Sequence, residues 1–110
     1  MIKLTKKEQA ALKKFKAAVE KALAGKLVEI RLFGSKARGD ARKDSDIDVL
    51  VITLSEDWRV CDVVYDIGTD ILLETDVCIS PKVLNTKEFS QLGDTGSPFI
   101  KNVLHDGIIL

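Results

Sequence analysis

The order and spacing of apolar residues predict an α+β fold, a small mixed β-sheet with helices packed on it. Three apolar runs predict strands over 27–33, 47–54 and 75–80. Helical spacing before, between and after them gives the order helix, strand, helix, strand, helix, strand, helix. The second run is apolar on both faces, so its strand should be central and buried. We expect residues 1–110 to form a single domain of ordinary size.

A helix near the N-terminus is indicated by a capping box, the pairing of Thr5 with Glu8 three residues later. Apolar residues follow at helical intervals, and Gly25 ends the segment. Lysines crowd the remaining surface of this helix, which we expect to be a solvated face. Such a face could also attract a triphosphate or an acidic partner. The strand over 27–33 comes next, followed by a turn and a short helix over 34–42.

A third helix is predicted to begin near Asp57, with Ser55 as its cap. Gly68 in its middle costs about 1 kcal/mol relative to Ala, and it indicates a close packing contact. The acidic residues on one stripe of this helix are Asp62, Asp66 and Asp70. We expect that stripe to be solvated surface, because carboxylates four residues apart are ordinary on a long helix.

The last third of the chain is predicted to hold the third strand and smaller elements. Residues 75–80 alternate between the two faces, and Pro81 confines any continuation of that strand to a sheet edge. A short capped turn is expected at 86–89. A last helix begins with Pro98, which suits the first helical position. The apolar tail over 108–110 is expected to pair as a short edge strand.

Composition excludes several classes of protein. Seventeen basic and seventeen acidic residues balance, which argues against tight nonspecific nucleic-acid binding. Basic residues dominate 1–31 and acidic residues the remainder, which favours a small charged substrate or a protein partner. The longest uncharged stretch, 49–55, is too short to span a bilayer, and no signal peptide is evident. Cys61 and Cys78 lack metal-site spacing, so we expect buried free thiols in a reducing cytoplasm.

The segment over 32–51 carries the features that indicate chemistry. An apolar run stops at Gly34-Ser35, a basic stretch follows, and two carboxylates, Asp46 and Asp48, open the next strand. Residues two apart in a strand point to one face, about 6 to 7 Å apart. Without a cation between them, the repulsion of these carboxylates is on the order of 2 to 3 kcal/mol.

A divalent cation with bound phosphates would explain this arrangement. Carboxylate oxygens suit Mg²⁺ or Mn²⁺, which are usually held by one or two carboxylates plus substrate phosphates. Gly34 lets the backbone approach such phosphates, Ser35 offers a hydroxyl, and Arg38 can bind them through its guanidinium. A plain turn followed by a solvated helix is the alternative, but it leaves Asp48 without a partner in an apolar strand.

The motif resembles that of a known family. Gly34-Ser35, ten intervening residues and Asp46-Ile47-Asp48 resemble the signature of the nucleotidyltransferase superfamily that includes DNA polymerase beta. The longer strings GSKARG and SDIDVLV resemble the minimal nucleotidyltransferases, the antitoxin partners of HEPN-type RNase toxins. The resemblance extends loosely to the C-terminal end.

The resemblance implies a nucleotidyltransferase fold and transfer of a nucleotide, AMP from ATP, to a hydroxyl on a HEPN-type toxin. The implied catalytic and metal-binding residues are Asp46, Asp48 and Asp76. The implied nucleotide-binding residues are Gly34, Ser35 and Arg38. Asp76 is included because it is the acid in the third apolar run, although it could simply start that strand. Mg²⁺ or Mn²⁺ would be the cofactor.

Two other functions stay open at this point. The chain could be a non-catalytic antitoxin that neutralises its partner by forming a complex with it. It could also be the catalytic module of a transferase that acts on RNA or on a small molecule. The sequence specifies neither the nucleotide, nor the acceptor, nor the oligomeric state.

Overall fold

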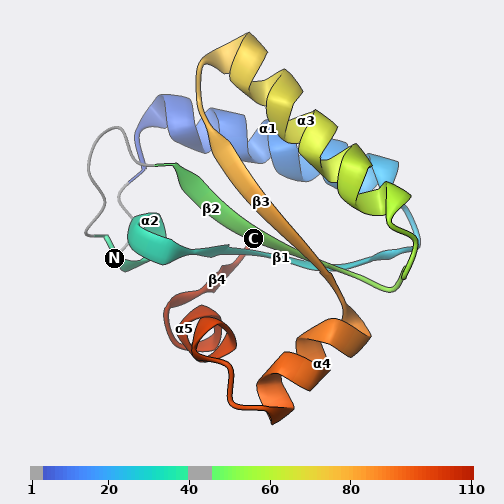
Figure 1. The fold of residues 1–110 in the computed structure, drawn as a ribbon. Helices are drawn as coiled ribbons and strands as arrows, with labels where there is room; N and C mark the ends of the chain where they lie inside the picture. The colour runs from blue at the N-terminus through green and yellow to red at the C-terminus, as the bar shows by residue number, and fades with distance from the viewer. Residues whose placement is uncertain (1–3, 40–45) are drawn as a thin grey trace.

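The centre of the fold is a four-stranded sheet in the order β3-β2-β1-β4 (Figure 1). The computed structural model describes residues 4–39 and 46–110. The strands are β1 (Leu27–Phe33), β2 (Ile47–Thr53), β3 (Ile79–Asn85) and β4 (Ile108–Ile109). β1 runs antiparallel to β2 and β4, whereas β2 and β3 are parallel. The predicted mixed sheet with a central second strand is confirmed.

Helices cover both faces of this sheet. They are α1 (Lys6–Ala22), α2 (Gly34–Arg38), α3 (Arg59–Thr75), α4 (Thr86–Asp94) and α5 (Pro98–Asp106). The long helices α1 and α3 lie together over one face, and α4 and α5 lie on the opposite side (Figure 1). α3 connects the parallel strands β2 and β3, as parallel pairing requires a crossover.

β2 is buried on both faces because each face contributes to a different apolar cluster. Val49 and Val51 belong to the cluster formed with α1 and α3. Leu50 and Ile52 belong to the cluster formed with α4 and α5. The continuous apolar run from Val49 to Ile52 therefore satisfies two cores, as its composition predicted.

The structure contains the two features that the sequence predicts near the ends of the chain. The Thr5 hydroxyl accepts a hydrogen bond from the Glu8 amide at 3.1 Å, and the Glu8 carboxylate accepts one from the Thr5 amide at 3.0 Å. The predicted capping box is thus confirmed. At the other end β4 pairs with β1, and the Leu110 amide donates to the Ile30 carbonyl at 2.9 Å. The predicted short edge strand is also confirmed.

The predicted third strand over 75–80 is wrong in its position. α3 continues through Thr75, and Asp76 ends it in the left-handed conformation with φ of 62°. β3 begins only at Ile79 and continues through Pro81. The helical spacing of apolar residues continues to the end of α3 at Thr75. The alternating pattern that follows is short, and it did not define where the strand begins. Pro81 is tolerated because β3 is an edge strand, as expected.

Two smaller expectations are also corrected. The turn predicted at 86–89 is the first part of α4, which Asn85 caps by accepting from the Glu88 amide at 2.8 Å. Both cysteines are free, but only Cys61 is half-buried, because Cys78 lies exposed just before the edge strand. The expected turn and helix end within 40–45 lie outside the described residues.

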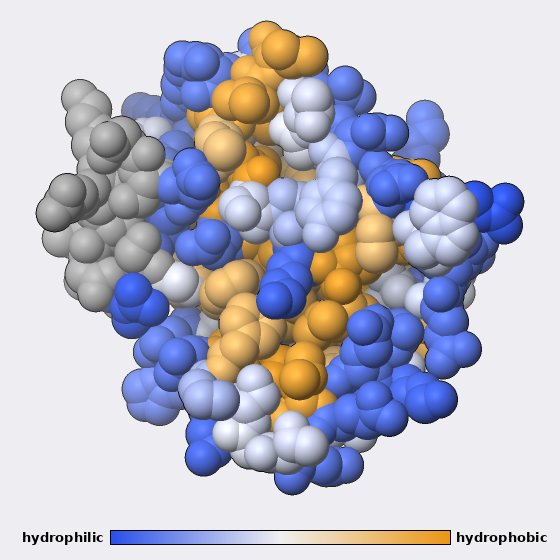
Figure 2. Space-filling view, in the orientation of Figure 1, coloured by the Kyte–Doolittle hydropathy of each residue, from blue (hydrophilic) through white to orange (hydrophobic). Residues whose placement is uncertain are grey.

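The exposed and buried positions of α3 agree with the pattern expected from the sequence. The acidic stripe on α3 is exposed, as predicted, and Gly68 is buried, with the Ile79 carbonyl 3.5 Å from where a β-carbon would lie. Figure 2 shows a band of apolar and weakly polar residues between two hydrophilic flanks on the side where β3 lies. Within 4–39 and 46–110, none of the helices is long and apolar enough to cross a membrane.

Candidate active site

The carboxylate pair lies where β2 begins and β1 ends. Asp48 is the second residue of β2 and is paired with Phe33 on β1 and Ser80 on β3. Asp46 directly precedes the strand and is exposed, whereas Asp48 is partly buried. The antiparallel pairing of β1 and β2 therefore places the Gly34 turn beside Asp48, although residues 35–47 separate the two in the sequence.

Gly34 encloses one side of the Asp48 carboxylate. Its φ is +73°, a conformation that residues with a β-carbon rarely adopt. A β-carbon built on Gly34 would lie 2.4 Å from Asp48 Oδ2, well inside van der Waals contact. Two independent constraints, backbone conformation and lack of space, thus require glycine here. The turn and the carboxylate form one site.

Electrostatics show that this site favours a positive charge. Burial is the main reason that the pKa of Asp48 lies above its usual value, and the negative charge of Asp46 raises it further. The positive charge of Arg38, at the end of α2, acts in the opposite direction. A divalent cation bound by both carboxylates would remove the repulsion between them and offset the loss of hydration. Asp46 and Asp48 therefore fit a hard cation such as Mg²⁺.

Asp76 does not lie on the strand beside Asp48. It was expected on the strand beside Asp48, but it caps α3 before β3 begins. The residue that pairs with Asp48 on β3 is Ser80. Among the described residues, no three His, Cys, Asp or Glu side chains gather in a way that could hold a metal ion.

The two other residues expected at the nucleotide site lie on α2. Ser35 is the second residue of this short helix. Arg38 is its last residue, and its charge acts on Asp48. The structure thus brings Gly34, Arg38 and the carboxylate pair to one corner of the sheet.

An ion pair below α2 was missed by the sequence analysis. Lys36 Nζ lies 2.7 Å from Glu8 Oε2, and only 3% and 12% of the two side chains are exposed. Burial alone would raise the pKa of Glu8, but the Lys36 hydrogen bond, the Lys36 charge and the hydrogen bonds with Thr5 outweigh it and lower the pKa. The pair fastens the Gly34 turn and α2 to the first turn of α1. No local pattern reveals it, because the partners come together only through the packing of α1 on the sheet.

Glu8→Gln should destabilise the fold by about 1 to 3 kcal/mol at neutral pH, because the buried Lys36 ammonium loses its ion pair with residue 8. Glutamine still accepts the Thr5 amide, so the capping box is kept. Urea unfolding measures the change. Glu74→Gln is the matched control: it breaks the exposed pair of Glu74 with Lys14, which should matter little. Equal losses in both variants would contradict a special role for the Lys36 pair.

The lowered pKa of Glu8 also predicts an acid-sensitive fold. A lowered carboxyl pKa stabilises the folded state at pH values above the unfolded-state pKa, which is about 4.3 for Glu. This stabilisation is lost as the pH falls through the lower pKa of the folded state. Wild-type stability should therefore decline below about pH 4, and Glu8→Gln should remove part of that decline.

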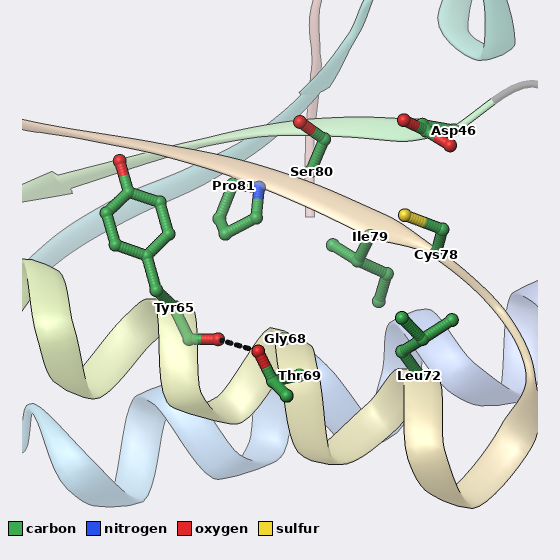
Figure 3. A pocket seen from close by; sticks show the side chains of 9 residues that line it. All are labelled: Asp46, Tyr65, Gly68, Thr69, Leu72, Cys78, Ile79, Ser80 and Pro81. Atoms are coloured by element: carbon green, nitrogen blue, oxygen red, sulfur yellow. Dashed lines mark hydrogen bonds between the residues drawn. The ribbon is translucent and has the colours of Figure 1, made fainter.

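A cavity of about 300 Å³ opens beside Asp46, between α3 and the start of β3 (Figure 3). Cys78 and Ser80 lie next to Asp46 along its β3 side. Burial, a hydrogen bond with Asp46 and the charges of Asp46 and Asp48 raise the pKa of the Cys78 thiol. Sequence analysis did not predict this cavity, because its walls come from α3 and β3, which approach each other at Gly68 only in the folded chain.

The mixed sheet, the glycine turn and the carboxylate pair are the features that the sequence led us to expect of a nucleotidyltransferase. The sequence matches the family model of the nucleotidyltransferase domain over residues 12–92. The chain belongs to that family.

Two curated relatives come from Methanocaldococcus jannaschii. "Putative protein adenylyltransferase MJ0604" is 36% identical over 103 residues, which cover 94% of this chain and 97% of the relative. "Putative protein adenylyltransferase MJ0141" is 37% identical over 75 residues, or 64% of this chain and 72% of the relative. The similarity to the first relative thus extends over nearly the whole of both chains.

Two solved structures share the fold at low identity. A crystal structure described as a toxin-antitoxin with AMP-PNP matches with a TM-score of 0.54 and 17% identity, over 86% of this chain and 68% of that chain. A crystal structure of a mutant of the toxin-antitoxin MntA-HpeT matches with the same TM-score and identity, over 90% and 70% of the two chains. These likenesses confirm the nucleotidyltransferase fold.

Proposed function

We propose that this chain is a Mg²⁺- or Mn²⁺-dependent adenylyltransferase that transfers AMP from ATP to a hydroxyl on a partner protein. The observation that supports the proposal is the close fit of the Gly34 turn against Asp48. In addition, the charges of Asp46 and Arg38 shift the pKa of the Asp48 carboxyl in opposite directions. The names of the curated relatives support a protein as the acceptor. The toxin-antitoxin structures support a toxin as that protein, and the family resemblance favours a HEPN-type RNase.

The residues divide into two groups in this proposal. Asp46 and Asp48 hold the divalent cation, which when bound would neutralise charge on the phosphates during transfer. Gly34, Ser35 and Arg38 hold the triphosphate, with Arg38 supplying a bidentate donor for phosphate oxygens. Asp76 ends α3 and is not on β3, so the proposal relies on the two carboxylates at the start of β2.

The transfer itself is tested with the partner present. The chain should be co-expressed with a candidate HEPN-type toxin, and the intact mass of that toxin should be measured. We expect a gain of one or more AMP masses that depends on this chain. An unmodified toxin that is nevertheless neutralised would favour the non-catalytic antitoxin, in which the chain acts by covering its partner.

The phosphate assignment predicts a selective loss of affinity. Ser35→Ala and Arg38→Ala should weaken ATP binding by about 10-fold or more, since hydrogen bonds to charged groups contribute about 1.5 to 3 kcal/mol. Adenosine binding should change little, because adenosine has no phosphate to contact. Calorimetry with both ligands measures the difference, and Lys21→Ala on α1 is the control for simple loss of positive charge. Equal losses for ATP and adenosine would rule out the phosphate role.

A further inference from the structure

The face of the sheet that carries Asp48 also carries a lysine that the site as described so far does not use. Leu50, two residues after Asp48, packs in the apolar cluster formed with α4 and α5, so the Asp48 side chain points to that same face. On β3, Ser80 pairs with Asp48 and Lys82 pairs with Leu50. Figure 3 shows the Ser80 side chain pointing away from α3. Lys82, two residues further along β3, therefore lies on the Asp48 face of the sheet.

The Lys82 ammonium lies over an aromatic pair at the border of the site. Its Nζ is 4.6 Å from the centre of the Phe99 ring on α5. The Phe99 and Phe33 rings meet edge to face, with 5.3 Å between their centroids. Phe33 pairs with Asp48 and directly precedes Gly34. Both rings are half-buried and Lys82 is exposed, so the ammonium lies at the open end of an aromatic wall that begins beside Asp48.

The positive charge of Lys82 is not neutralised by a described carboxylate. Among the ion pairs within 4–39 and 46–110, none includes Lys82. Arg31, which lies on the other side of Leu50, is by contrast held by Glu29 in a largely buried ion pair. The contact between Lys82 and Phe99 is weak at an exposed site. An anionic group of a ligand can therefore draw the ammonium away from the ring.

The shape of the site indicates which part of a nucleotide lies near Lys82. The Gly34 turn has no room for a β-carbon beside Asp48, which favours the approach of the compact terminal phosphates over that of the nucleoside. The nucleoside needs open space and apolar contact, and the β3 edge offers both beside Phe99. Because Asp48 lies between these two ends, the terminal phosphates lie toward Gly34 and Arg38. The α-phosphate, which carries the nucleoside, then lies toward Lys82.

We propose that Lys82 binds the α-phosphate of the nucleotide from the β3 side, opposite Arg38, which binds the terminal phosphates. The proposal rests on the proposed function. The Lys82 side chain leaves the Phe99 ring and forms charge-assisted hydrogen bonds with the nonbridging oxygens of the α-phosphate. Lysine suits this position because its ammonium is a compact charge on a flexible side chain. The Phe99 ring that Lys82 uncovers then contacts the nucleoside.

The test removes the charge of Lys82 and keeps an unbranched side chain over Phe99. Lys82→Met does this, and Lys82→Arg keeps the charge. Lys101→Met is the matched control, because it removes an exposed lysine from α5, the helix that carries Phe99. The probes are AMP, which has only the α-phosphate, pyrophosphate, which represents the two terminal phosphates, and adenosine, which has no phosphate. Calorimetry with Mg²⁺ measures their affinities, and urea unfolding checks that each variant is folded.

We expect Lys82→Met to weaken AMP binding by about 10-fold or more and to leave pyrophosphate and adenosine binding unchanged. Arg38→Ala should show the opposite pattern, with pyrophosphate binding weakened and AMP binding kept. Lys82→Arg and Lys101→Met should bind AMP as the wild type does.

Three results would overturn the assignment of Lys82 and leave the adenylyltransferase standing: no AMP binding by the wild type, unchanged AMP binding in Lys82→Met, or a loss of pyrophosphate binding in its place. AMP binding that depends on Lys82, without AMP transfer from ATP to a HEPN-type toxin by the wild type, would instead contradict the proposed function.

Discussion

Asp48→Asn should reduce adenylyl transfer by about 10³-fold or more, which corresponds to about 4 kcal/mol of lost transition-state stabilisation. The same variant should be as stable as the wild type without metal, or more stable. The reason is the raised pKa of Asp48, which burial causes and Asp46 reinforces. A carboxyl whose folded-state pKa is raised adds stability at low pH and loses it as the pH rises through that pKa. At neutral pH the wild type therefore carries an unfavourable negative charge that Asn lacks.

Three measurements define this experiment: transfer, Mg²⁺-dependent ATP binding, and thermal unfolding with and without Mg²⁺. Mg²⁺ should stabilise the wild type and leave Asp48→Asn unaffected. Asp76→Asn is the control, because asparagine tolerates the left-handed conformation that residue 76 adopts. A large loss of transfer in Asp76→Asn would restore a third carboxylate to the site. Unfolding of Asp48→Asn at neutral pH without metal would indicate a structural role instead.

The same variant separates catalysis from simple binding. If AMP transfer neutralises the toxin, Asp48→Asn should leave the toxin unmodified and active, even where the two proteins still form a complex. In the proposed HEPN-type RNase, an added phosphate diester would place negative charge where RNA phosphate binds, and the modification would thereby inhibit the enzyme. Full neutralisation by Asp48→Asn, without any modified toxin, would leave only the binding antitoxin.

Gly34→Ala should cost both stability and transfer. The positive φ of Gly34 costs an alanine about 1 to 2 kcal/mol. In addition, the new β-carbon would lie 2.4 Å from Asp48 Oδ2, so the carboxylate must move. Because Asp48 is proposed to hold the cation, we expect transfer to fall by about 10²-fold or more, as small displacements of reacting groups have large effects.

Gly25→Ala provides the matched control for this prediction. Gly25 also has a positive φ, +79°, but nothing lies within 4 Å of the position of its β-carbon. It should therefore show the backbone cost alone, as a similar loss in urea unfolding with normal transfer. Weakened Mg²⁺-dependent ATP binding only in Gly34→Ala would locate the effect at the carboxylate. Normal transfer in Gly34→Ala would contradict the close contact with Asp48.

Features with local causes could be derived from the sequence alone. The capping box needs only Thr5 and Glu8, which are neighbours on one helical turn. The apolar residues on both faces of β2 identified a central strand, because each residue reports the face that it occupies. The spacing from the Gly34 turn to the carboxylates likewise predicted that they serve one site. In each case the residues responsible lie close together in the sequence.

Features that depend on packing between distant segments were decided only by the tertiary structure. The boundary between α3 and β3 moved Asp76 off the strand and put Ser80 beside Asp48, because parallel pairing with β2 sets the register. The burial of Lys36 against Glu8 depends on α1 lying next to α2. The cavity beside Asp46 depends on how closely α3 approaches β3 at Gly68. The proximity of the Gly34 turn to Asp48 could thus be predicted from sequence, whereas the other neighbours of Asp48 depend on contacts between elements that lie far apart along the chain.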